Sequence, residues 1–172
     1  MNYWINVFLE AAVFAVVVNV VFQTVYRVQG ALRQVYKYPP RLRERIMHMA
    51  LVGERELGNT RGTNRAVGCM LLVVLPLVVV VWVNGVTAFW PAFVQLYIFL
   101  NAYSVFKAVV VDCLYFAHAE FWVIPGTEEM VEDYRDYWFH LRPAVMNLGL
   151  LAVPAALMAL MVVLLNSGIL LE

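Results

Sequence analysis

Polar and charged side chains interrupt an apolar stretch at residues 91–120, where they can form a polar site within a membrane helix. They are Asn101, Ser104, Lys107, Asp112 and, near the end of the stretch, His118. At about 100° per residue, Asn101 and Asp112 point within about 20° of each other, and Lys107 and His118 lie about 100–120° further round. Charged groups at membrane depth are costly and normally face a bundle interior, a partner or water. We therefore predict a pathway or polar site here, with a purely structural polar network as the alternative.

Two further groups of residues have the chemistry of a site. Glu10 lies about two turns into the first apolar stretch and is added to the candidate pathway, although it can instead reach the outer interface. Five arginines can bind the phosphate of a lipid headgroup or of a soluble anion: Arg41, Arg43, Arg45, Arg61 and Arg65. The alternative is that these arginines only set the topology of the chain.

The spacing of the histidines and of other reactive side chains in the sequence matches no catalytic or metal-binding motif. His48, His118 and His140 are not at helical i, i+3 or i, i+4 separations, so no metal ligand is assigned and no cofactor can be named. There is no nucleophile elbow, Walker loop or glycine-rich dinucleotide turn, so no catalytic residue is assigned. Whether the chain is an enzyme stays open, with a non-enzyme preferred.

The amino-acid composition indicates which kind of structure positions the candidate site residues. Of 172 residues, 63% are hydrophobic and 14% charged, and the mean hydropathy is +0.75, whereas soluble domains have roughly 25% charged residues. We predict an all-α integral membrane protein of the plasma or inner membrane, forming a single membrane domain over residues 1–172. Four transmembrane helices are expected at about residues 3–26, 66–83, 91–118 and 143–165.

The two longer connections carry opposite charge. Residues 27–65 contain nine basic and three acidic residues, a net charge of +6, while residues 118–142 contain six acidic and two basic residues, a net charge of −4. The positive-inside rule puts the segments 27–65 and 119–142 in the cytoplasm and both termini outside. We expect the two segments to be amphipathic and to dock on each other as a cap, held mostly by their apolar faces.

Local signals divide these segments further. Pro40 predicts the start of a helix with an apolar face, and the Gly, Asn and Thr content of residues 58–65 predicts a loop. Thr127 predicts the start of a surface helix that ends where Pro143 opens the fourth span. Met130, Tyr134, Tyr137, Trp138 and Leu141 would form its apolar face. Pro76, within the second span, predicts a kink or a locally opened backbone.

Three functions fit these observations. The leading hypothesis is a transporter or channel-like protein, acting as a homo-oligomer because four helices alone enclose little space. The second is a non-catalytic subunit that assembles with other membrane subunits. The third is a membrane enzyme acting on lipid at the inner leaflet. The expected partners are the lipid bilayer and other membrane chains, and no nucleic acid, because the basic segment is confined between two spans.

Overall fold

Long helices dominate the structure, a computed structural model that describes residues 3–167. Within that range every regular element is helical. Three helical stretches are long and apolar enough to cross a membrane: Tyr3–Gln29 (α1), Glu54–Val83, and Phe89–Phe116. A fourth candidate is the pair Glu128–Leu150 and Ala152–Asn166, bent by 45° at the break between them. This pair contains α7 (Tyr137–Leu150) and α8 (Ala152–Asn166). The helical class is thus confirmed, with three to four helices of spanning length.

Two of these stretches change from α-helix to π-helix along their length. The second contains α3 (Glu54–Cys69), a π-segment (Met70–Val74), α4 (Leu75–Val78) and another π-segment (Val79–Val83). Pro76 lies in α4, between the two π-segments, so the locally opened backbone predicted there is confirmed. The third stretch consists of α5 (Phe89–Phe106) and a π-helix, η4 (Lys107–Phe116). A π-helix bonds residues five apart and is often found at functional sites.

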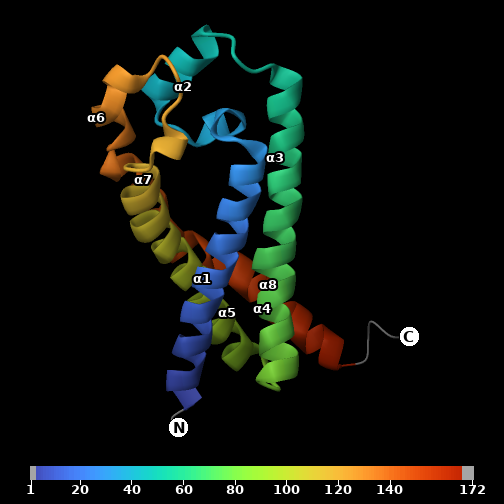
Figure 1. Cartoon of the computed structure of the whole chain (residues 1–172). Coiled ribbons are helices and arrows are strands. Elements are labelled where there is room, and N and C mark those ends of the chain that lie inside the picture. Colours follow the sequence, from blue (N-terminus) through green and yellow to red (C-terminus); the bar gives the residue numbers. More distant parts are fainter. Residues whose placement is uncertain (1–2, 168–172) are drawn as a thin grey trace.

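The shorter elements gather at the end of the bundle that carries α2 and α6 (Figure 1). They are η1 (Ala31–Lys37), α2 (Pro40–His48), η5 (Glu120–Trp122), η6 (Glu128–Met130) and α6 (Val131–Tyr134). Gly30, with a φ of 86°, ends α1 and lets the chain turn into η1. Pro40 occupies the first turn of α2, as predicted.

The helix α5 lies at the centre of the bundle. It packs against α1, where the rings of Phe14 and Phe99 are 5.2 Å apart, centroid to centroid. On another side it packs against α8, where Ala155 and Ala159 are completely buried in the same cluster as Leu96. Small side chains such as these let two helices approach closely, so α5 can contact both neighbours and carry polar groups between them.

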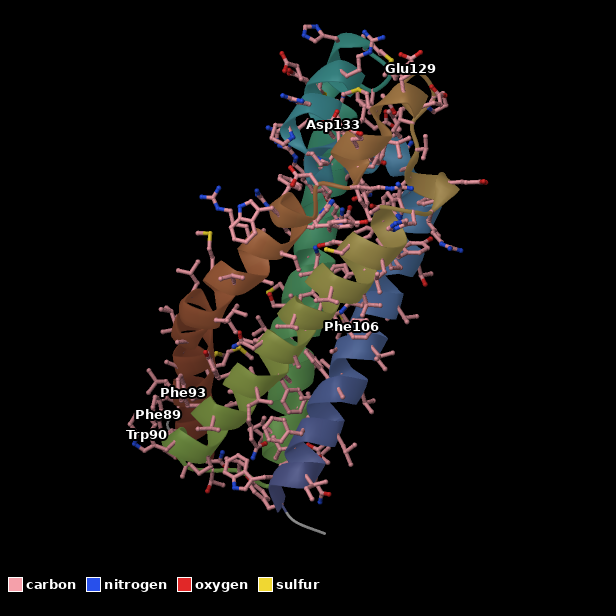
Figure 2. The ribbon with its side chains drawn as sticks, turned by 90° about the vertical axis from the view of Figure 1, so that its left-hand side faces the viewer. Phe89, Trp90, Phe93, Phe106, Glu129 and Asp133 are labelled. Atoms are coloured by element: carbon pink, nitrogen blue, oxygen red, sulfur yellow. The ribbon has the colours of Figure 1, made fainter. Side chains whose placement is uncertain are left out.

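The two ends of the bundle differ in chemistry. Figure 2 shows Phe89, Trp90 and Phe93 together at the start of α5, and Glu129 and Asp133 at the opposite end of the molecule. Trp90 is 70% exposed, which suits an aromatic residue at a membrane interface. The polar connections therefore lie at one end, and an aromatic edge lies at the other.

Residues 58–65 are helical, so the predicted loop was wrong. They lie within α3, which continues into the apolar stretch that follows. Extending an existing helix costs far less than nucleating a new one, and Leu57 and Thr60 are buried. The hydroxyls of Thr60 and Thr63 donate to carbonyls four residues earlier. The helix itself thus satisfies side chains that otherwise favour loops.

The acidic connection does not form the single surface helix predicted from Thr127. Asp136 starts a new helix instead, because its carboxylate accepts a hydrogen bond of 3.0 Å from a backbone N–H three residues later. Tyr137 and Trp138, expected on an apolar face along the membrane surface, are 42% and 65% exposed. Pro143 lies inside α7, so the predicted surface helix does not end at this residue.

The basic and acidic connections pack against each other, as predicted. The Tyr38 hydroxyl donates to the Trp122 carbonyl at 2.7 Å, and the Tyr38 ring lies 5.8 Å from the ring of Tyr134. Over residues 3–167 a single ion pair joins the two connections, Arg41 to Asp133 at 3.9 Å, and the Arg41 side chain is 85% exposed. Exposed pairs contribute little, so buried aromatic contacts hold this cap.

Candidate binding cavity

A cavity of about 410 Å³ is lined by α1, η1, α5, η4, η5 and α7 at the end of the bundle nearest the cap. Its polar lining comprises Asn19, Gln23, Lys37, Ser104, Lys107, Asp112, His140 and Asn147. Aromatic side chains supply much of the remaining wall: Phe22, Tyr26, Tyr36, Tyr103, Phe116, Trp122 and Phe139. Small-molecule pockets have roughly 300–1,000 Å³ and mostly apolar walls with a few polar groups. The cavity has the size and chemistry of such a pocket.

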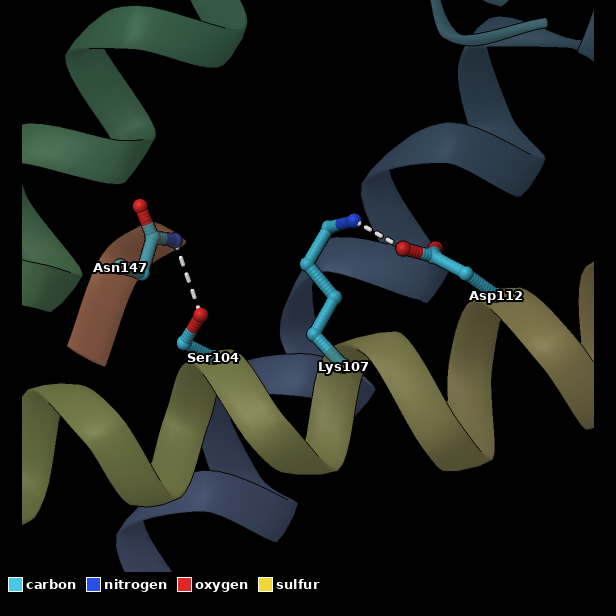
Figure 3. Close-up of polar contacts among 4 residues, drawn as sticks. All are labelled: Ser104, Lys107, Asp112 and Asn147. Carbon is cyan, nitrogen blue, oxygen red and sulfur yellow. Dashed lines mark hydrogen bonds and ion pairs between the residues drawn. The ribbon is translucent and has the colours of Figure 1, made fainter. Parts of the chain in front are cut away.

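Lys107 and Asp112 form an ion pair in the wall of this cavity (Figure 3), with 2.5 Å between Nζ and Oδ2. Residues five apart are separated by about 140° round an α-helix, which is why the sequence predicted that the two would point in different directions. They lie in the π-helix η4, in which residues five apart are stacked along the axis. The irregular backbone thus allows the two charges to neutralise each other.

Ser104 and Asn147 connect α5 to α7 across the cavity wall. The Asn147 amide donates to the Ser104 hydroxyl at 2.9 Å (Figure 3). Asn101, which the sequence placed on the same polar stripe, instead donates to the carbonyl of Tyr97 on its own helix and does not line the cavity. Of the polar residues predicted to form a site on this stretch, Ser104, Lys107 and Asp112 therefore line the cavity and Asn101 does not.

Glu10 and His118 lie outside the cavity. Glu10 accepts a hydrogen bond of 2.8 Å from Asn84, whose amide also lies 2.8 Å from the Gln95 side-chain oxygen. Gln95 in turn donates to the hydroxyl of Tyr3. This outer polar cluster joins α1 and α5 at the end of the bundle opposite the cap. His118 is exposed just beyond the end of η4, and its Nδ1 atom lies 3.0 Å from the backbone carbonyl oxygen of Leu114.

Lys37 is a cavity residue that the sequence reasoning missed. Its Nζ is buried without a hydrogen-bond partner and lies 2.9 Å from the centroid of the Tyr26 ring. Burial, together with the nearby charge of Lys107, lowers the pKa of Lys37 to about 6, and Asp112 opposes this shift. One signal in the sequence could have identified Lys37, because the chain has only two lysines among its twelve basic residues. In the structure both lysines line the cavity, and no arginine is among its lining residues. Lysine tolerates burial by losing its charge, whereas arginine does not.

The five arginines predicted to bind anions do not converge. Arg41 pairs with Asp133, and Arg43 and Arg45 are exposed on α2. Arg61 lies on α3 with its guanidinium 5.1 Å from the ring of Tyr36, a cavity residue, and Arg65 is exposed on the same helix. Burial raises the pKa of Tyr36, and Asn64, Arg61 and Arg65 oppose the shift. Only the α3 arginines are thus linked to the cavity.

Other chemistry has no comparable arrangement in the described part of the chain. Among residues 3–167 no group of three His, Cys, Asp or Glu side chains is placed to hold a metal ion. Comparison of the chain with protein-family models, curated proteins and solved structures finds no match.

Proposed function

We propose that this chain is a multi-pass membrane transporter that admits a solute to the cavity from the cytoplasmic side. Its spans would be the three long helical stretches and the bent pair α7 and α8. Nine of the twelve basic residues lie at positions 27–65, at the cap end of the bundle. The positive-inside rule therefore supports a cytoplasmic cap and termini on the outer side.

The observation that carries the proposal is the contrast between the two ends of the bundle. Near the cap, α1 and α7 leave a cavity with polar groups from five elements. At the other end, the outer polar cluster links Tyr3, Glu10, Asn84 and Gln95. Between the two, Phe14 and Phe99 pack in a continuous core. A site near one membrane face with a closed opposite end is one of the two states that alternating access requires.

Cysteine accessibility tests this proposal without knowledge of the solute. Ala108 lines the cavity and is 3% exposed, so Ala108→Cys would report on access to it. The background would be Cys69→Ser and Cys113→Ser, which removes both native thiols. Ala92→Cys is the matched control, because Ala92 is on the same helical stretch but is fully buried in the packing cluster shared with α8.

A membrane-impermeant maleimide would be applied to inside-out and right-side-out vesicles. We expect the cysteine at position 108 to react rapidly from the cytoplasmic side and slowly from the outer side, and the control cysteine at position 92 to stay unmodified. Reaction from the cytoplasmic side alone, even after prolonged exposure, would refute alternating access.

A second function is favoured by the exposure of one helical stretch. Only 11% of the apolar window of Glu54–Val83 is buried, compared with 39% in the other two long stretches. Met70 and Trp82 on this stretch are 68% and 73% exposed. The face can contact lipid, a second copy of the chain or another membrane subunit. Native mass spectrometry of the gently extracted protein distinguishes these cases by reporting copy number and foreign chains.

A further inference from the structure

Buried polar atoms without partners gather around the cavity. Over residues 3–167, seven buried side-chain nitrogen or oxygen atoms lack a hydrogen-bond partner, and four of them belong to residues that line this cavity. They are the Gln23 Oε1, Lys37 Nζ, Trp122 Nε1 and His140 Nε2 atoms. Leaving such a group unpaired is costly, so a cluster of them calls for an explanation such as a ligand.

Two of the unpaired groups are donors: the Trp122 indole N–H and, once protonated, the Lys37 amine. The Gln23 Oε1 atom accepts, and the His140 Nε2 atom donates or accepts according to the tautomer of the ring. The carboxylate of Asp112, the acidic group in the cavity wall, is already occupied by Lys107. The remaining cationic group is therefore Lys37, and its natural counterpart is an oxyanion.

The apolar walls restrict the rest of the ligand. Phe22, Phe116 and Phe139 line the same cavity as Lys37 and have no polar group to offer. A small hydrated inorganic ion would leave these walls unmatched, whereas an organic anion would cover them. A volume of about 410 Å³ suits a small amphiphile or the headgroup region of a larger one.

We propose that the cavity binds the carboxylate or phosphate group of an anionic amphiphile, with the Lys37 ammonium as its counter-ion and the aromatic walls around its apolar part. The anion can come from a soluble metabolite or from a lipid of the inner leaflet. This binding site deepens the proposed transport function and rests on it, because the bound amphiphile would be the transported solute. Binding itself can be measured in detergent, separately from transport.

The test uses the full chain in a neutral detergent and measures the shift in melting temperature on adding ligand. The probes are hexanoate and hexyl phosphate, each compared with hexanamide, which has a similar apolar part and no charge. The variants are Lys37→Met and Arg43→Gln. Arg43 is exposed on α2 and does not line the cavity, so its substitution removes one positive charge elsewhere.

We expect at least one anion to stabilise the wild-type protein and Arg43→Gln, with hexanamide having no effect. Lys37→Met should weaken anion binding at least tenfold. Equal stabilisation by hexanamide, or undiminished anion binding by Lys37→Met, would show that this arm has no Lys37-dependent anion binding.

A second arm identifies a lipid source. Native mass spectrometry of wild-type protein, extracted from vesicles that contain equal phosphatidylglycerol and phosphatidylcholine, should show retained phosphatidylglycerol that Lys37→Met loses. Lys37-dependent binding in either arm supports the proposal, and its absence from both refutes it. If binding depends on Lys37 but the cavity is never accessible from the outer side, the transport function fails and the binding site stands.

Discussion

Replacing Lys37 by methionine should stabilise the protein at neutral pH. The pKa of Lys37 falls from 10.5 to about 6 on burial, so at pH 7 the folded protein holds a mostly neutral amine that the unfolded chain would protonate. Each pKa unit corresponds to about 1.4 kcal/mol, and the roughly 3.5 units between pH 7 and the ordinary pKa amount to about 5 kcal/mol. The substitution also removes the contact of the Lys37 amine with the Tyr26 ring, which offsets part of this gain. We expect a net gain of about 2–3 kcal/mol.

The gain should depend on pH with a defined sign. A lysine whose pKa is lowered by folding destabilises the folded state wherever the unfolded chain carries the extra proton. The difference in stability between Lys37→Met and wild type should therefore widen as the pH falls from about 10 to about 6, and stay constant below about 6. Tyr26, Tyr36, Lys107, Asp112 and His140 share this cavity with Lys37, so the comparison of Lys37→Met with the wild type leaves all five unchanged.

Thermal unfolding in detergent, followed by circular dichroism, measures the effect. A gain of 2–3 kcal/mol should raise the melting temperature by about 5–10 °C for a chain of this length. Lys107→Met is the matched control, since the same substitution there removes the partner of Asp112 and should lower the melting temperature. If both substitutions lower the melting temperature alike, the reasoning about Lys37 is refuted.

Three further predictions concern the ion pair, the cap and α3. Asp112→Asn should abolish transport while lowering stability by only about 1–2 kcal/mol, because the Lys107 side chain is 36% exposed; flux measured in proteoliposomes near wild-type level contradicts this role. Tyr38→Phe should cost about 1 kcal/mol by removing the hydrogen bond to Trp122, and Arg41→Ala less than about 0.5 kcal/mol; equal melting temperatures for the two variants would count against a larger role for the buried hydrogen bond than for the exposed ion pair. Gly62→Ala should raise the melting temperature, because no atom lies within 4 Å of the added Cβ and alanine favours helix by about 1 kcal/mol; a decrease would argue that residues 58–65 form a loop.

The sequence predicted the helical class because long apolar runs have few alternative structures. It also predicted that the connections would pack together and that Pro76 would disturb its helix. It failed at residues 58–65, where composition favoured a loop but continuation from the adjacent span stabilised a helix. It also failed at Asp136, whose capping hydrogen bond divides a segment that otherwise has a continuous helical pattern.

The candidate site was predicted only in part, and the reason is the backbone. A projection at 100° per residue separates Lys107 from Asp112, and the sequence does not reveal that η4 is a π-helix. Lys37 lies in a segment whose positive charge was already explained by topology, so its burial was not apparent. Asn101 donates its amide N–H to a carbonyl of its own helix and does not line the cavity. For Asp112 and Asn101, local hydrogen bonding of the helix therefore decided the outcome.

The pairing of Lys107 determines the role of Lys37. With Asp112 neutralised by Lys107, the cavity has no unpaired carboxylate to balance a protonated Lys37. Protonation of this amine is therefore costly in the empty protein and becomes favourable when an anion lies beside it. The free energy that Lys37→Met recovers as stability is the same free energy that an anionic ligand relieves on binding. A variant that melts at higher temperature should thus also bind the anion more weakly, and the two effects should share one pH dependence.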